Sequence, residues 1–188
     1  QSWKQSAASK GWKRINTWSK MVLTNALTVQ PSYGQQIFIL SAPIQTGKTT
    51  ALLNWSEKRT DVYGILTPVV NGKRMFMNAH NRQIFSMEAK EGEETVLKVG
   101  RFTFSERNFN QAIAIIRDAM DKKGWLIIDE IGPMELRGDG FSEVVKEIIA
   151  LRKGMILLVV RANDNLPDRV KEFFAIHTAT IIEQLPAD

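Results

Sequence analysis

The hydrophobic positions of the chain form short apolar runs that alternate with longer stretches of helical spacing. Short apolar runs bounded by turn residues are typical of buried strands, whereas apolar residues three or four positions apart form one face of a helix. Because strands and helices alternate, the pattern predicts an α/β fold with a mainly parallel sheet and helices on both faces. The expected strands are 36–41, 62–67, 125–129, 155–160 and 178–183, and the expected helices are 49–59, 105–123, 140–153 and 166–174.

The pattern changes between residues 68 and 104. Here the apolar and polar residues alternate over short runs, and Gly92 and Gly100 separate some of these runs. Alternation over a few residues between turn-forming residues is typical of antiparallel hairpins. We therefore expect 68–104 to be a β-hairpin insertion in the main architecture, with strands at 73–78, 82–87, 95–99 and 101–104.

The charge distribution separates the first 35 residues from the rest of the chain. Of the net charge of +5, all five positive charges come from residues 1–35, which contain no acidic residue. The remaining residues, 36–188, hold equal numbers of basic and acidic side chains and are expected to form a single domain. The basic charge thus describes an N-terminal arm, and it gives no clear indication of nucleic-acid binding by the domain.

Within this arm, residues 10–28 have the spacing of an amphipathic helix. Its apolar stripe includes Trp12, Ile15 and Trp18, and basic residues occupy other positions. A basic amphipathic helix can rest on an anionic membrane or dock on a protein partner. The alternative, which we favour, is that the stripe packs on its own domain or on a neighbouring subunit. The Trp-lined helix is therefore the candidate surface for a protein partner or for self-association.

Several classes of protein are disfavoured by composition. The chain has no cysteine, which excludes disulfides and thiolate chemistry and is compatible with a reducing compartment. Its two histidines, His80 and His177, are far apart in sequence, so a histidine-based zinc site is not expected. No apolar run approaches the ~20 residues of a transmembrane helix, and no signal peptide is evident. We expect a cytoplasmic protein.

A candidate phosphate loop lies between the first expected strand and the first expected helix. The Gly-Lys-Thr sequence at Gly47, Lys48 and Thr49 matches the second half of the motif Gly, four residues, Gly-Lys-Ser/Thr. In such loops backbone N–H groups surround the phosphates, the lysine bridges the β- and γ-phosphates, and the hydroxyl ligates Mg²⁺. The residues expected to contact the nucleotide are Ala42, Pro43, Ile44, Gln45, Thr46, Gly47, Lys48, Thr49 and Thr50.

A second candidate feature is the apolar strand at 125–129, which ends in the acidic pair Asp129 and Glu130. In phosphoryl-transfer sites an aspartate at such a strand end holds Mg²⁺, and a glutamate can act as the base that activates water. Neighbouring residues on a strand point to opposite faces, so the two carboxylates should have different roles. We expect Asp129 and Thr49 at the metal, and Glu130 and Lys48 as the catalytic residues.

The sequence leaves two further roles open. Glu135 contacts the substrate or water, or it anchors its own loop by hydrogen bonds; the two alternatives have equal weight. Positive charge beyond Lys48 is usually needed at the γ-phosphate in the transition state. The candidates near expected strand ends are Arg137, Arg161 and Arg169, and the sequence does not choose among them.

The segment 129–136, Asp-Glu-Ile-Gly-Pro-Met-Glu-Leu, resembles the DEIG-x-MEL signature of a family of small P-loop nucleoside-triphosphatases. Members of this family occur in thermophiles and vertebrates, and it is also called the cancer-related NTPase family. The phosphate loop and the segment 64–74 are also similar, and the resemblance covers roughly residues 36–160. Two departures are Ala42 and Gln45, which stand where the family has glycine, and the arm 1–35 has no recognised counterpart.

The resemblance implies a RecA-like P-loop fold and slow, Mg²⁺-dependent hydrolysis of nucleoside triphosphates to diphosphate and phosphate. It also implies broad base tolerance, with ATP, GTP or another nucleoside triphosphate as the substrate. One alternative is a nucleotide or small-molecule kinase on the same scaffold, for which the hairpin region offers Arg74 and Arg82 as candidate lid arginines. Another is a nucleotide-binding switch gated by a partner through the helix at 10–28.

Overall fold

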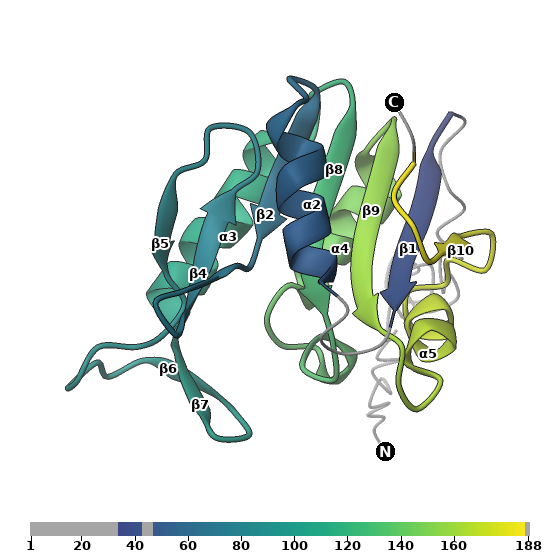
Figure 1. Ribbon diagram of the computed structural model, residues 1–188. Helices are drawn as coiled ribbons and strands as arrows, with labels where there is room; N and C mark the ends of the chain where they lie inside the picture. Colours follow the sequence, from purple (N-terminus) through teal and green to yellow (C-terminus); the bar gives the residue numbers. More distant parts are fainter. Residues whose placement is uncertain (1–33, 43–46, 187–188) are drawn as a thin grey trace, which may run out of the picture.

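The computed structural model describes residues 34–42 and 47–186 (Figure 1). The helix expected at 10–28 lies outside these residues, as does the stretch from Pro43 to Thr46. No helix within the described part is long and apolar enough to cross a membrane. Along the chain the elements are β1 Gln36–Ala42, α2 Lys48–Glu57, β2 Val62–Leu66, β3 Val69–Val70, β4 Lys73–Asn78, β5 Ile84–Ser86, β6 Val96–Val99, β7 Phe102–Ser105, α3 Glu106–Asp118, β8 Trp125–Ile131, a 3-10 turn Glu135–Arg137, α4 Ser142–Leu151, β9 Met155–Arg161, α5 Leu166–Phe173 and β10 Thr180–Ile182.

The main sheet has the strand order β10-β1-β9-β8-β2-β4-β3. The first five strands in this order are parallel to their neighbours, and β4 then pairs antiparallel with β2. The carboxyl ends of β1, β9, β8 and β2 therefore lie at one edge, with β9 between the strand before the phosphate loop and the strand that carries the acidic pair. The predicted α/β fold with a mainly parallel sheet is confirmed.

Helices cover both faces of this sheet, as Figure 1 shows. Alternate residues of β8 belong to different apolar clusters: Ile127 packs in the cluster that includes Leu52 of α2, whereas Ile128 packs in the cluster formed with α3, α4 and α5. This alternation follows from the strand period of two, and both side chains are fully buried. Burial on both faces explains why β8 and β9 are almost continuously apolar.

The antiparallel region predicted between residues 68 and 104 is also present. Strands β3 and β5 pair antiparallel with β4, which extends the main sheet, whereas β6 and β7 form a separate two-stranded hairpin. Strand β5 is shorter than the expected run 82–87. At its start Arg82 has a positive φ of 62°, and its guanidinium donates hydrogen bonds to the Leu53 carbonyl (3.0 Å) and the Ser56 hydroxyl (3.1 Å) of α2.

Helix α3 ends at Asp118 rather than at the expected residue 123. The fully buried Arg152 explains this end, because its guanidinium donates hydrogen bonds to the carbonyls of Ala119, Met120 and Gly124 at 2.7–2.9 Å. A buried cation that donates to three carbonyls at the end of α3 replaces the further helical turn. This contact also ties α3 to the start of β8.

Candidate active site

The phosphate loop has the expected strand and helix on its two sides. Strand β1 ends at Ala42, and α2 begins at Lys48. Between them Gly47 has a φ of 79°, in the left-handed region where glycine carries no Cβ penalty. Pro43, Ile44, Gln45 and Thr46 lie outside the described residues. The ends of the loop thus meet the sheet at its carboxyl edge, beside the start of a helix, where anions are favoured.

Thr49 and Asp129 are brought together at this edge, although they are 80 residues apart in sequence. The Thr49 hydroxyl donates to Asp129 Oδ2 over 3.4 Å, and the backbone N–H of Thr67, just after β2, donates to the same oxygen over 3.0 Å. Asp129 is buried, and burial raises the pKa of its carboxyl to about 6, against the opposing effect of the Thr67 hydrogen bond. Thr67 belongs to the segment 64–74 that resembles the family, but the sequence alone assigned it no role at Asp129.

Glu130 follows Asp129 at the end of β8 and has a different partner. The register between β8 and β9 shifts here, since Asp129 pairs with Val159 and Ile131 with Val160, so Glu130 is an extra residue in the manner of a β-bulge. Its Oε1 atom lies 2.5 Å from Nε of Arg161, at the end of β9, and both side chains are half-buried.

Of the three candidate arginines, only Arg161 contacts the acidic pair. Arg137 is exposed and lies 3.9 Å from Asp139, a contact of the kind that contributes little at a surface. Arg169 is exposed on α5. Arg161 is therefore the candidate arginine that lies next to the acidic pair, whereas the sequence did not distinguish it from Arg137 and Arg169.

Glu135 is buried and anchors its own loop. Its Oε2 accepts the N–H of Gly132 at 2.8 Å, and Oε1 accepts the N–H of Phe141 over 3.4 Å. These are the contacts expected from the second of the two alternatives for this residue. Burial raises the pKa of the carboxyl to about 7, although the hydrogen bond from Gly132 acts in the opposite direction.

The raised pKa of Glu135 predicts a pH-dependent stability. Because the folded-state pKa of about 7 exceeds the ordinary value of 4.5, the protonated carboxyl stabilises the fold below pH 4.5, and this contribution is lost as the pH rises through 7. The expected loss is about 2–3 kcal/mol of unfolding free energy. Denaturant unfolding of the wild type and of Glu135→Gln between pH 4.5 and 8 measures it. The variant should have the shallower fall with pH, and parallel curves for the two proteins would contradict the assignment.

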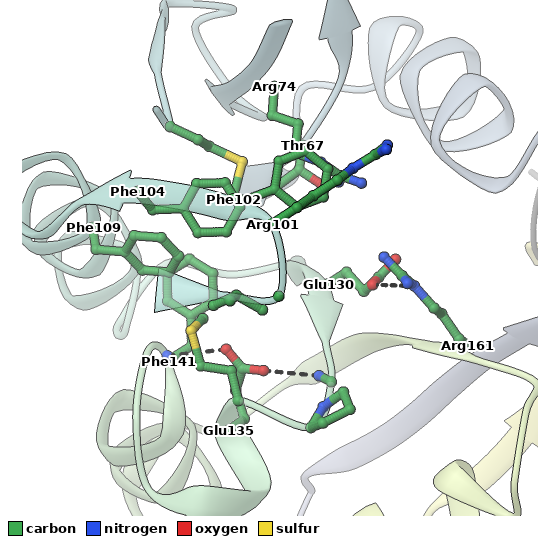
Figure 2. Close-up of a pocket in the computed structure, with 16 residues that line it drawn as sticks. Thr67, Arg74, Arg101, Phe102, Phe104, Phe109, Glu130, Glu135, Phe141 and Arg161 are labelled. Carbon is green, nitrogen blue, oxygen red and sulfur yellow. Dashed lines mark hydrogen bonds and ion pairs between the residues drawn. The ribbon is translucent and has the colours of Figure 1, made fainter. Parts of the chain in front are cut away.

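A cavity of about 330 Å³ opens beside Glu130 and Glu135 (Figure 2). Phenylalanine rings line one side of it, and Glu130 with its partner Arg161 lies on the opposite side. Arg74 and Arg101 also line the cavity. No motif in the sequence indicates this cavity, because its walls come from separate elements, among them β4, β7, α3 and the loops before and after the 3-10 turn.

Comparisons with known proteins place the fold and the family. A family described as NTPase matches residues 37–184. The chain belongs to the NTPase family. The match extends beyond the range of roughly 36–160 over which the resemblance was recognised, and it confirms the family inferred from the acidic signature. The class of enzyme that was predicted, a nucleoside-triphosphatase, is confirmed with it.

Individual members of the NTPase family agree with this assignment. The chain is 32% identical to nucleoside-triphosphatase THEP1 of Methanocaldococcus jannaschii, over 78% of this chain and 88% of the relative. It is 29% identical to the THEP1 protein of Saccharolobus solfataricus, over 72% and 81% of the two chains. The crystal structure of THEP1 from Aquifex aeolicus matches with a TM-score of 0.59 at 25% identity, over 80% of this chain and 91% of that one. A human cancer-related nucleoside triphosphatase has the same TM-score at 19% identity, covers 81% of this chain and 90% of its own, and shows the shared fold alone.

Proposed function

We propose that the protein hydrolyses nucleoside triphosphates to diphosphate and phosphate in a Mg²⁺-dependent reaction, with Glu130 as the base. The observation that carries this proposal is the meeting of Thr49, Asp129 and Glu130 at the carboxyl edge of the sheet, directly beside the ends of the phosphate loop. The slow rate and the broad base tolerance are supported by the family resemblance.

The phosphates are assigned to the loop from Ala42 to Thr50. Gly47 supplies the left-handed turn that admits a close approach of the backbone, and the N-terminus of α2 directs its backbone N–H groups toward the loop. Lys48 begins this helix, and its ammonium is proposed to bridge the β- and γ-phosphates. These roles fit the amino-acid types and the strand–loop–helix context.

The metal is assigned to Thr49 and Asp129. Both present oxygen atoms, one from a hydroxyl and one from a buried carboxylate, and Mg²⁺ prefers oxygen ligands. When bound, Mg²⁺ neutralises charge on the phosphates. The N–H of Thr67 fixes the orientation of the Asp129 carboxylate, so Thr67 is proposed as a positioning residue.

Glu130 is proposed to take a proton from the attacking water. A base must be held in a fixed direction, and the 2.5 Å contact with Arg161 holds the Glu130 carboxylate in place. Because the Arg161 guanidinium lies on Glu130, we assign Arg161 as the group that positions the base.

The parts of the chain have separate proposed roles. Residues 36–188 form the catalytic domain, with 68–104 as its hairpin insertion, and residues 1–35 form a basic arm. The Trp stripe and the five positive charges of this arm support a docking role toward a partner or a second copy of the chain. A chain without cysteine suits a reducing compartment, and we propose a cytoplasmic location.

The proposal is tested by phosphate release from ATP, GTP, CTP and UTP, with Mg²⁺ and with a chelator. We expect release from all four nucleotides only with Mg²⁺, and a loss of about 10²-fold or more in Lys48→Ala, because a charge on the transferring phosphate is removed. Lys58→Ala, at the exposed opposite end of the same helix, is the matched control and should keep its rate. Release that persists in Lys48→Ala or in the chelator would overturn the proposal.

A further inference from the structure

The cavity beside Glu130 has the composition of a binding site for a flat ring. Phe104, Phe109 and Phe141 are buried, and neighbouring centroids in this series are 5.9 and 5.3 Å apart. Phe102 stacks nearly parallel on Phe104, with centroids 5.8 Å apart. The cavity volume of about 330 Å³ lies within the range of small-molecule sites. Aromatic walls of this kind favour a ligand with its own aromatic ring.

Two arginines add positive charge to the same cavity. The guanidinium carbons of Arg74 and Arg101 lie 4.8 and 5.1 Å from the centroid of Phe102, so both side chains stack on one ring. Within the described part of the chain neither arginine forms an ion pair with a carboxylate. Figure 2 shows them on the side of the cavity that carries Phe102. A pair of guanidinium groups without a carboxylate partner favours an anion, and phosphate suits their fork of donors.

The cavity also borders the proposed hydrolytic site. Glu130 and Thr67 line it, and the Thr67 N–H donates to Asp129, which in turn accepts from Thr49. A ligand in the cavity would therefore lie close to Glu130 and to the residues proposed to hold the metal. The charge of Glu130 does not repel an anionic ligand strongly, because Arg161 pairs with it.

We propose that this cavity binds a nucleoside monophosphate, whose phosphate accepts the γ-phosphoryl group of the bound nucleoside triphosphate in place of water. In this proposal the nucleobase of the monophosphate lies among the phenylalanines, and Arg74 and Arg101 hold its phosphate. The inference rests on the proposed function for the triphosphate site, and it adds a second substrate to that site.

The transfer balances without a further reactant. An oxygen of the monophosphate dianion forms a bond to the γ-phosphorus, the bond from the γ-phosphorus to the β,γ-bridging oxygen breaks, and two nucleoside diphosphates result. The attacking oxygen is already ionised, so this reaction needs no base. Hydrolysis, in contrast, must remove a proton from water. Glu130 is therefore required for hydrolysis and dispensable for transfer. A substitution of Glu130 should separate the two reactions.

The experiment follows the label of γ-³²P-ATP with Mg²⁺ and each of AMP, GMP, CMP and UMP, and separates labelled diphosphate from labelled phosphate by chromatography. We expect labelled diphosphate with at least one monophosphate. Lys48→Ala, purified in the same way, should give none, which excludes a contaminating kinase. Glu130→Gln should keep the transfer while phosphate release falls.

The double variant Arg74→Ala/Arg101→Ala tests the cavity itself. It should lose transfer by about tenfold or more, because charge-assisted hydrogen bonds to the acceptor are removed, and it should keep its phosphate release without monophosphate. Arg107→Ala, an exposed arginine of α3 outside the cavity, is the matched control and should keep both reactions.

Four results would overturn the inference. Phosphate release without labelled diphosphate from any of the four monophosphates removes the acceptor role and leaves the hydrolase intact. Transfer that survives in the double variant places the acceptor elsewhere. A raised KM for ATP in the double variant indicates that the cavity holds the base of the hydrolysed nucleotide. If the wild-type protein gives neither phosphate release nor transfer, the proposed function and this inference are both wrong.

Discussion

Replacing Glu130 with Gln is expected to lower phosphate release by about 10²–10⁴-fold while nucleotide binding is retained. The range is that of a general base, since the amide of Gln has nearly the same shape and cannot accept the proton of the attacking water. Glu130 is half-buried and pairs with Arg161, and no phosphate-binding role is assigned to it, so its replacement by Gln should leave the affinity for nucleotide nearly unchanged. Single-turnover phosphate release and titration of a fluorescent nucleotide measure the two quantities separately.

Two controls give this experiment its meaning. Glu143→Gln removes an exposed carboxylate in the first turn of α4 that pairs with Lys146 and does not line the cavity, and it should have wild-type turnover. Arg161→Gln tests the positioning role: it should lower the rate less than Glu130→Gln does, because the carboxylate is kept and loses only the partner that holds its direction. A Glu130→Gln enzyme with wild-type turnover would remove Glu130 from the mechanism.

The sheet could be predicted from the sequence because its strands are buried on both faces. Runs such as Ile127–Ile128 and the apolar core of β9 leave little ambiguity, since a sheet covered by helices on both sides has no polar side. The ends of elements were less well predicted. α3 ends early because Arg152, a residue from beyond α4, takes the carbonyls that a further helical turn would have used.

The candidate site was predicted where its residues are neighbours in sequence and missed where they are not. Asp129 and Glu130 are adjacent, and the phosphate loop is continuous, so each forms a motif. The cavity is assembled from Arg74, Arg101 and Phe141, which stand far apart in the sequence and belong to separate elements. No sequence pattern links these residues. They come together only when the hairpin region packs against α3 and the loop before α4.

Arg74 and Arg82, the two candidate arginines for a kinase lid, have different surroundings in the fold. Arg74 lines the cavity, whereas Arg82 points to α2, where its guanidinium is occupied by the Leu53 carbonyl and the Ser56 hydroxyl. The second arginine of the hairpin region that lines the cavity with Arg74 is Arg101. The hairpin region thus supplies the pair of charges that the kinase alternative requires, but with a different second member from the one considered in the sequence.

Replacing Asp129 with Asn is expected to lower Mg²⁺-dependent phosphate release by about 10²–10³-fold and, in a chelator, to raise the free energy of unfolding. The loss of activity follows from the removal of the charged oxygen proposed for the metal. The gain in stability follows from burial, because a carboxylate with 1% exposure has been desolvated without a cationic partner among the described residues. A neutral amide of the same shape carries a smaller cost, and the difference should be about 1–3 kcal/mol.

The opposite signs of the two effects distinguish a metal-binding role for Asp129 from a structural one. If Asp129 held the fold together through Thr49 and Thr67, its replacement would lower stability and activity alike. Denaturant unfolding in a chelator, with the exposed Asp118→Asn as the matched control, measures the first effect. Adding Mg²⁺ with a non-hydrolysable nucleotide should then stabilise the wild type and have less effect on Asp129→Asn, since a ligand stabilises a protein only as far as it binds the folded state. A variant that is less stable than the wild type in the chelator would assign Asp129 to the fold rather than to the metal.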